Sequence, residues 1–260
     1  MKVRTIARWH VRETWRSALV WGLALASLSV LEVAIYPSVH KTLAKVVNDY
    51  PPALKQAFNV HDLSTVQAFL DVEMFSLMIP LAAGFFAIRC ATRETVTAEE
   101  RNWLDVLLAA PLERRDLVAG VAGGTLISLA LLLIAIAVPT EIASVVVGSA
   151  IPLDLLAAGL FSTWALGALC AGLAAVGAGL IHRGATVTAG AMGVLVAMYV
   201  LDLVGKLAPS VDGLRWASVF RYTEGALKDG LDPGGVALVL AVAAGGFALG
   251  GWLFDRKDLR

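Results

Sequence analysis

This chain is poor in the residues on which soluble enzymes depend. Charged residues make up 16% of its 260 residues, whereas an ordinary soluble domain carries about 25%. The formal net charge is zero and no basic tail is present, so the composition argues against nucleic acid as a partner. The two cysteines, Cys90 and Cys170, both lie in or beside apolar runs. We therefore expect buried thiols and not a disulfide or a metal pair.

Catalytic motifs are also absent from the sequence. It contains no G-x-x-x-x-G-K-[ST] motif, so the chain by itself cannot hold the phosphates of ATP in a P-loop. It contains neither H-E-x-x-H nor G-x-S-x-G. The four histidines are scattered at the ends of apolar runs or in loops, which favours interfacial side chains over metal ligands. We therefore expect a non-catalytic protein that binds no cofactor and no metal directly.

Apolar residues, in contrast, are abundant and occur in long blocks. The sequence is 58% hydrophobic and its mean hydropathy is +0.75. The blocks are about 20 residues long, the length that crosses a bilayer as a helix. The sequence therefore predicts an all-α, polytopic membrane protein in which residues 1–260 form a single transmembrane domain. The six predicted spans are 17–36, 67–88, 118–138, 155–181, 185–204 and 235–254.

Lysine and arginine are distributed unevenly between the two sides of these spans. They are concentrated in the N-terminal arm, in the loop between the second and third spans and at the C-terminus. The positive-inside rule places these segments in the cytoplasm. We therefore expect a multi-pass protein of the cell inner (plasma) membrane with both termini cytoplasmic.

The N-terminal arm, residues 1–16, is itself amphipathic. Arg4, Arg8, Arg12 and Arg16 recur every four residues, opposite an apolar face. This pattern predicts an elbow helix that lies on the anionic inner leaflet before the first span. The simpler alternative is that these arginines only flank the span on its positive side.

The segment 97–117 is the most informative polar stretch between two spans. Thr97 and Glu100 form a capping-box pattern that predicts the start of a helix, and Pro111 predicts its end. Between them, apolar residues fall on one helical face and charged residues on the other. A short amphipathic helix between two spans needs a surface to dock on, either lipid or a soluble partner.

Two carboxylates fall within predicted spans, and one predicted outer loop is unusually apolar. Glu32 lies within the first span and Asp202 near the outer end of the fifth, and an ionisable group at membrane depth is a functional hypothesis by default. Both are candidate pathway residues, with a structural hydrogen bond or an interfacial position as the alternative. The outer segment 205–234 carries too much apolar surface for a loop in water, which predicts re-entrant helices packed on protein.

Small residues crowd several spans, for example in Gly120-x-x-x-Gly124 and Gly246-x-x-x-Gly250. Glycine allows helix backbones to approach closely in lipid. The pattern favours close packing within the chain, and a mobile dimer interface is the alternative.

Together these features resemble the permease subunits of ABC-2-type transporters. The basic elbow before the first span is one part of the match. A second is the stretch EERNWLDVLLAAPLERR at 99–115, similar to the "LDLLLatP" core of that family. Supporting parts are SVFRY at 218–222, where Val219 replaces the usual proline, and FDRKDL at 254–259, where Lys257 replaces an arginine. The resemblance covers essentially the whole chain.

The resemblance implies that the segment 97–117 is a cytoplasmic coupling helix that fits a cleft on a separate ATPase. It also implies two copies of this P-loop ATPase, which bind the ATP, and a second permease, either the same chain or a paralogue. The implied function is to form the translocation pathway of an ATP-driven exporter. The implied contacts with the ATPase are Glu99, Glu100, Arg101, Trp103, Leu104, Asp105, Leu107 and Leu108.

Two other classes of protein remain open at this point. An ion-coupled secondary transporter would use Glu32 and Asp202 as coupling carboxylates, but the sequence has no inverted repeat or paired broken helices. That class also leaves the segment 97–117 without a role. A membrane enzyme or an assembly factor is the other alternative, and the missing catalytic motifs argue against the enzyme only.

Overall fold

Six long helices form one bundle. The structure, a computed structural model, describes residues 2–48, 65–100 and 113–257. In this part of the chain, six helices are long and apolar enough to cross a membrane, and each overlaps one predicted span. The six-span, all-helical prediction is therefore confirmed. These helices are Lys2–Val39, Val66–Arg93, Arg114–Val146, Leu153–Leu180, Gly184–Leu207 and Pro233–Arg256.

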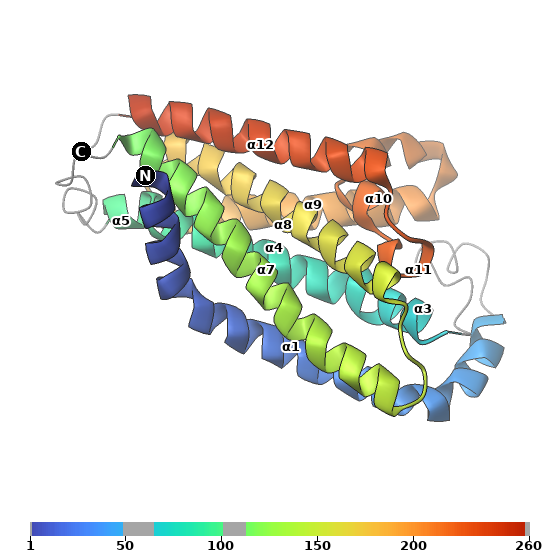
Figure 1. The fold of residues 1–260 in the computed structure, drawn as a ribbon. Coiled ribbons are helices and arrows are strands. Elements are labelled where there is room, and N and C mark those ends of the chain that lie inside the picture. The colour runs from blue at the N-terminus through green and yellow to red at the C-terminus, as the bar shows by residue number, and fades with distance from the viewer. Residues whose placement is uncertain (1, 49–64, 101–112, 258–260) are drawn as a thin grey trace.

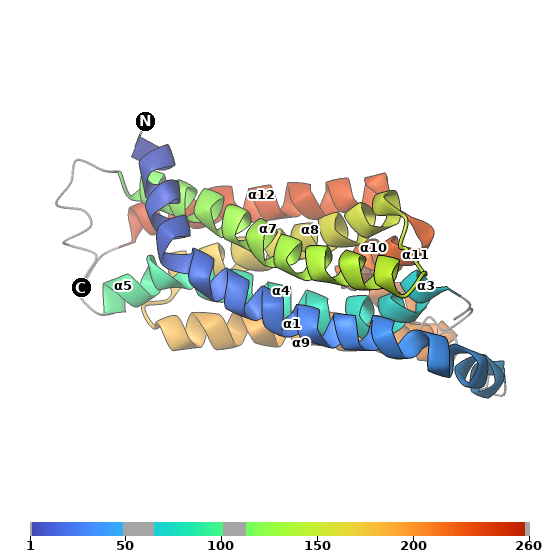
Figure 2. The same cartoon turned by 60° about the horizontal axis from the view of Figure 1, so that its bottom comes forward.

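The first of these helices, α1, begins at the same end of the bundle at which the last, α12, ends (Figure 1). We call it the terminal end and the opposite one the distal end. The short helix α5 lies at the terminal end, and α3, α10 and α11 lie at the distal end (Figure 2). In chain order the helices are α1 (Lys2–Asn48), α3 (Val66–Leu70), the π-helix η1 (Asp71–Met78), α4 (Ile79–Arg93), α5 (Val96–Glu100), α7 (Arg114–Val146), α8 (Leu153–Leu180), α9 (Gly184–Leu207), the 3₁₀ helix η2 (Pro209–Ala217), α10 (Phe220–Thr223), α11 (Ala226–Asp229) and α12 (Pro233–Arg256).

Helix α8 forms the centre of the bundle and contacts α4, α7, α9 and α12. In its most apolar segment of 18 residues, 72% is buried inside the protein, whereas in the corresponding segment of α9 only 22% is buried. Small residues bring α8 and α12 close together: a Cβ on Gly250 would lie 2.6 Å from the backbone carbon of Ala175. Gly246 faces Gly172 in the same way. The glycines of this pair therefore serve packing within the chain, as the sequence favoured.

The N-terminal arm packs on α7. Helix α1 is continuous, but it changes direction after its first few turns (Figure 1). Ile6 and His10 are buried against Gly120 and Gly124 of α7, while Arg8 is exposed. The amphipathic pattern is therefore present, but part of its apolar face is covered by protein. An elbow on the lipid surface stays a prediction.

His10 also connects this arm to α4 and α7 in the interior. Its side chain is fully buried, and its Nδ1 lies 2.8 Å from Oε2 of Glu94, although the two atoms are not aligned for a hydrogen bond. Its Nε2 lies 3.2 Å from Oγ1 of Thr125. The interfacial position expected for the histidines is therefore wrong for His10, because α1 and α7 exclude solvent from it. Cys90 and Cys170 are free and buried, as predicted.

The turn between the third and fourth spans differs from the sequence-based expectation. The predicted third span ends at residue 138, before Pro139, but α7 continues through Pro139 to Val146. A proline inside a membrane helix is tolerated when neighbouring groups satisfy the freed backbone. The helix ends at Val146, and Gly148, whose φ is +76°, lies just beyond its C-cap, Val147. Hydrogen bonds from Gly148 N to Val145 O and from Ser149 N to Ser144 O complete a Schellman motif.

Candidate functional site

At the terminal end, a buried carboxylate connects three parts of the bundle. Glu99, in α5, is 8% exposed. One of its oxygens lies 2.6 Å from Nζ of Lys257, directly after α12. The other lies 2.6 Å from Nδ1 of His182, in the turn between α8 and α9. Because a buried charge without its partner is costly, these contacts hold α5 against both neighbours.

The next carboxylate, Glu100, holds the start of α9. Its Oε2 accepts a hydrogen bond of 2.9 Å from the backbone N–H of Gly184, the first residue of α9. A carboxylate at this position satisfies a free N–H and complements the helix dipole. The capping-box prediction is therefore wrong in detail. Helix α5 begins at Val96, before Thr97, and Glu100 caps a different helix.

Lys257 completes the cluster from the end of α12. Its Nζ also donates to the carbonyl oxygens of Ala178 and Ile181, at 2.9 and 2.8 Å, where α8 leaves its last carbonyls without helical partners. Arg114, the first residue of α7, donates to the carbonyl oxygen of Lys257 at 2.6 Å. Five helices therefore meet at one polar site. We call it the terminal junction, formed by Glu99, Glu100, Arg114, His182, Gly184 and Lys257.

The terminal junction contains only the beginning of the predicted coupling segment. The resemblance implies that Glu99 and Glu100 contact an ATPase. In the structure Glu99 is buried and paired within this chain, whereas Glu100 is exposed and accepts a hydrogen bond from the start of α9. A contact of either residue with an ATPase stays a prediction. The other predicted contacts lie outside the described residues: Arg101, Trp103, Leu104, Asp105, Leu107 and Leu108.

A groove of about 1070 Å³ opens beside the terminal junction. Helices α1, α4, α5 and α9 line it. Its apolar wall includes Trp21, Phe85 and Met192, and its polar wall includes Arg89 and Thr188. Ligand pockets for drug-sized molecules have volumes of roughly 300–1,000 Å³. The groove is therefore large enough to receive a drug-sized molecule.

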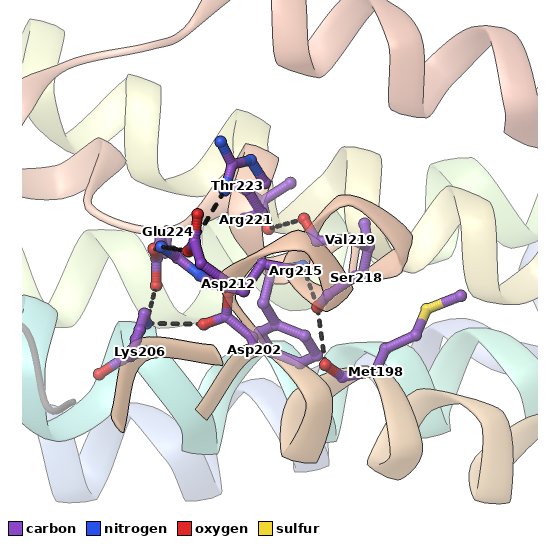
Figure 3. A network of polar contacts seen from close by, with 12 residues as sticks. Met198, Asp202, Lys206, Asp212, Arg215, Ser218, Val219, Arg221, Thr223 and Glu224 are labelled. Atoms are coloured by element: carbon purple, nitrogen blue, oxygen red, sulfur yellow. Dashed lines mark hydrogen bonds and ion pairs between the residues drawn. The ribbon is translucent and has the colours of Figure 1, made fainter. Parts of the chain in front are cut away.

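At the distal end, four charged side chains connect α9 to the segment that follows it (Figure 3). Arg215, in η2, donates to Asp202 Oδ1 and to Glu224 Oε1, each at 2.9 Å. Lys206 Nζ lies 2.7 Å from Asp202 Oδ2 and also pairs with Glu224. We call these four residues the distal network. Burial raises the pKa of the Glu224 carboxyl above its ordinary value, against the opposing effect of Lys206 and Arg215.

The segment 205–234 folds back along the bundle. Oγ of Ser218 donates to the carbonyl oxygen of Met198 at 2.7 Å (Figure 3), about two and a half turns before the end of α9. Phe220 and Leu227 are buried in the bundle core. The predicted short helices packed on protein are present as η2, α10 and α11.

The two candidate pathway carboxylates lie in different surroundings. Asp202 is 2% exposed and already paired with two cations in the distal network. Glu32, on α1, is half-buried, and its Oε2 has no hydrogen-bond partner within the described part of the chain. The structure therefore does not bring the two carboxylates together.

The cations of both clusters could not be singled out from the sequence. Lys206 is spaced i, i+4 from Asp202, a local signal that does indicate one of the pairs. Arg215 is spaced i, i+3 from Asp212, but no local spacing indicates its contact with Glu224 or that of His182 with Glu99, because these partners lie on other elements. Lys257 is 158 residues from Glu99, so only the fold reveals their contact.

Six apolar helices, a polar junction at one end and a folded-back segment at the other define a polytopic, all-helical membrane protein. The chain belongs to the family described as "Multidrug efflux system permease Rv1217c, C-terminal domain", whose model matches residues 8–255. It is therefore a transporter permease, and the match includes the groove, the distal network and every residue of the terminal junction except Lys257. No curated protein matches the chain.

Proposed function

We propose that this protein is the membrane-spanning permease subunit of an ABC-2-type, ATP-driven exporter. It forms the translocation pathway, and two copies of a separate P-loop ATPase supply the energy. A second permease, either a further copy or a paralogue, completes the complex. The terminal junction carries this proposal, because it joins the start of the segment 97–117 to the ends of the spans.

The terminal junction gives the segment a mechanical connection to the bundle. Glu99 connects α5 to the end of α12 and to the α8–α9 turn, and Glu100 connects α5 to α9. A displacement of the segment 97–117 would therefore move several helices and not α4 alone. Packed helices respond to such a displacement by rigid-body motion between discrete arrangements.

The side of the membrane follows from the charges at the terminal end. Arginines of the α1 arm and of α7 gather there, together with the C-terminal basic residues. The positive-inside rule places this end in the cytoplasm, where an ATPase that uses cytoplasmic ATP would reach the segment 97–117. The groove then opens on the cytoplasmic side, the side from which an exporter takes its substrate.

The distal network favours this function over ion-coupled transport. A coupling carboxylate has to exchange a proton or a metal ion during each cycle. Asp202 is enclosed by Lys206 and Arg215, so its charge already has permanent partners. Glu32 remains a candidate pathway residue, because one of its oxygens has no partner among the described groups.

Purification of the tagged chain from its native membrane tests the proposal. We expect a P-loop ATPase to co-purify in a stoichiometric amount, and the double substitution Leu104→Asp with Leu107→Asp to remove it without preventing membrane insertion. Leu153→Asp is the matched control, because it adds a carboxylate on an exposed residue at the distal end. If the wild-type chain is recovered without an ATPase, or the double variant retains it, the proposed coupling is wrong.

A further inference from the structure

We propose that the groove between α1, α4 and α9 binds amphiphilic anions, with Arg89 as the group that selects for negative charge. This inference rests on the proposed function for its meaning as a substrate class. The binding itself depends only on the groove. Its wall combines an apolar, aromatic surface with one cation that no carboxylate of the described residues neutralises.

The apolar part of the groove is a cluster of aromatic side chains from two helices. Trp21 of α1 and Phe85 of α4 have ring centroids 5.7 Å apart. Phe86 and Met192 extend the same wall. Aromatic and thioether side chains offer large contact areas to a flat apolar molecule. This surface accommodates the apolar body of a ligand without fixing its identity.

Arg89 lies over this aromatic surface. The carbon centre of its guanidinium is 6.0 Å from the centroid of Phe85, and the residue is exposed. No carboxylate within the described residues pairs with it. A guanidinium whose N–H groups are free can bind a carboxylate or a sulfonate through charge-assisted, bidentate hydrogen bonds.

The other charges in the wall already have partners. Arg93 Nη2 lies 3.1 Å from Oε2 of Glu13, and its Nε lies 3.2 Å from Oε1 of Glu94. Glu100 accepts the backbone N–H of Gly184, where the positive end of the α9 dipole offsets its charge. Arg89 therefore gives the groove its uncompensated positive charge, beside the apolar wall.

Hydroxyl groups on the facing helices add polar contacts. Thr92 and Thr188 both line the groove, and their oxygens lie 3.4 Å apart. Ser17 of α1 also lines the groove. The anionic group of a ligand would pair with Arg89, and its other polar atoms could form hydrogen bonds with these hydroxyl groups. An organic cation would be repelled by Arg89.

Three dyes with the same fluorophore test the charge preference: dansylglycine is an anion, dansylamide is neutral and dansylcadaverine is a cation. Binding is measured by fluorescence on the full chain in phosphatidylcholine nanodiscs. We expect dansylglycine to bind most tightly. Arg89→Gln should weaken dansylglycine about tenfold, the usual effect of losing one charge-assisted contact, and change dansylamide binding by less than about twofold. Arg89→Lys should retain most of the preference.

Arg16→Gln is the matched control. Arg16 is an exposed arginine at the same end of the bundle and also lies over an aromatic ring, that of Trp15, but it does not line the groove. Thr188→Glu provides a second, independent variant, because it places a carboxylate in the groove that offsets the charge of Arg89 and should abolish the preference for dansylglycine. Tighter binding of the cation by the wild type, or equal effects of Arg16→Gln and Arg89→Gln, would overturn the inference.

The lipid composition of the nanodisc distinguishes two sources of the anion, a membrane lipid and a free molecule. If phosphatidylglycerol in the nanodisc displaces dansylglycine from the wild type but not from Arg89→Gln, the groove binds an anionic lipid. If it does not, the groove binds free amphiphilic anions. The dye measurement needs no ATPase, so the two proposals can fail separately. If an ATPase co-purifies but the groove shows no preference for dansylglycine, only this inference is wrong. If the groove prefers dansylglycine but no ATPase co-purifies, only the proposed function is wrong.

Discussion

Lys257 is the residue on which most of the terminal junction depends. Its ammonium group makes an ion pair with Glu99 and hydrogen bonds to two carbonyl oxygens of α8 and the turn after it. The sequence marks this position only as a departure from the arginine of a terminal motif. Its partners are far away along the chain, so no local pattern could predict them.

Substitution of Lys257 by methionine should reduce the free energy of unfolding by about 3 kcal/mol, because it removes the ammonium group that contacts a buried carboxylate oxygen and two carbonyl groups. Denaturation in mixed micelles measures the change. Arg256→Gln is the control, since Arg256 is exposed and lies over the ring of Trp252, 4.1 Å away. Glu99→Gln combined with Lys257→Met should cost less than the sum of the two single substitutions. If Lys257→Met costs no more than Arg256→Gln, the ion pair does not hold the junction.

Glu224 gives the distal network a dependence on pH. Burial raises its pKa above the ordinary value of 4.5, so the folded protein retains a proton that the unfolded chain has already released. Stability from this group is therefore complete below pH 4.5 and is lost as the pH rises through the folded-state pKa. We expect the thermal midpoint to fall over this range in the wild type and to fall less in Glu224→Gln.

The comparison for this experiment is Asp212→Asn, which changes a half-exposed partner of Arg215 at the edge of the same network. It should leave the slope of the thermal midpoint against pH as in the wild type. Equal slopes for the wild type and Glu224→Gln would show that another group is responsible.

At the scale of elements, apolar composition predicts the spans well because bilayer thickness sets their length. Details that depend on backbone hydrogen bonding were not predictable. The sequence gives no sign that Asp71–Met78 is a π-helix or that α7 continues through Pro139. The contact partners of the glycine pairs also depend on the packing of whole helices, which spacing alone cannot reveal.

The α8–α12 contact yields a prediction on a single helix. Gly250→Ala should destabilise the bundle by about 1–3 kcal/mol, because its Cβ would lie 2.6 Å from the backbone of Ala175. Gly245→Ala is the control on the same helix, since a Cβ there meets nothing within 4 Å; it should be neutral or slightly stabilising. Denaturation in mixed micelles compares the two. Equal effects would show that the close approach of the helices is not important.

At the scale of the whole molecule, the terminal junction and the groove occupy the same end of the bundle and share Glu100. Movement of α5 would therefore change the wall of the groove as well as the positions of α9 and α12. The proposed contact with the ATPase and the proposed substrate-binding groove are therefore connected through α5. The distal network lies at the opposite end, where it fastens the folded-back segment to α9.

Transport in inside-out membrane vesicles tests the central claim most directly, with the permease and its co-purified ATPase present and dansylglycine as the probe. We predict that the vesicles accumulate the dye only when ATP is supplied outside, that a protonophore has no effect, and that the double substitution Leu104→Asp with Leu107→Asp abolishes accumulation. Accumulation driven by an ion gradient in the absence of ATP would contradict the account and support a secondary transporter.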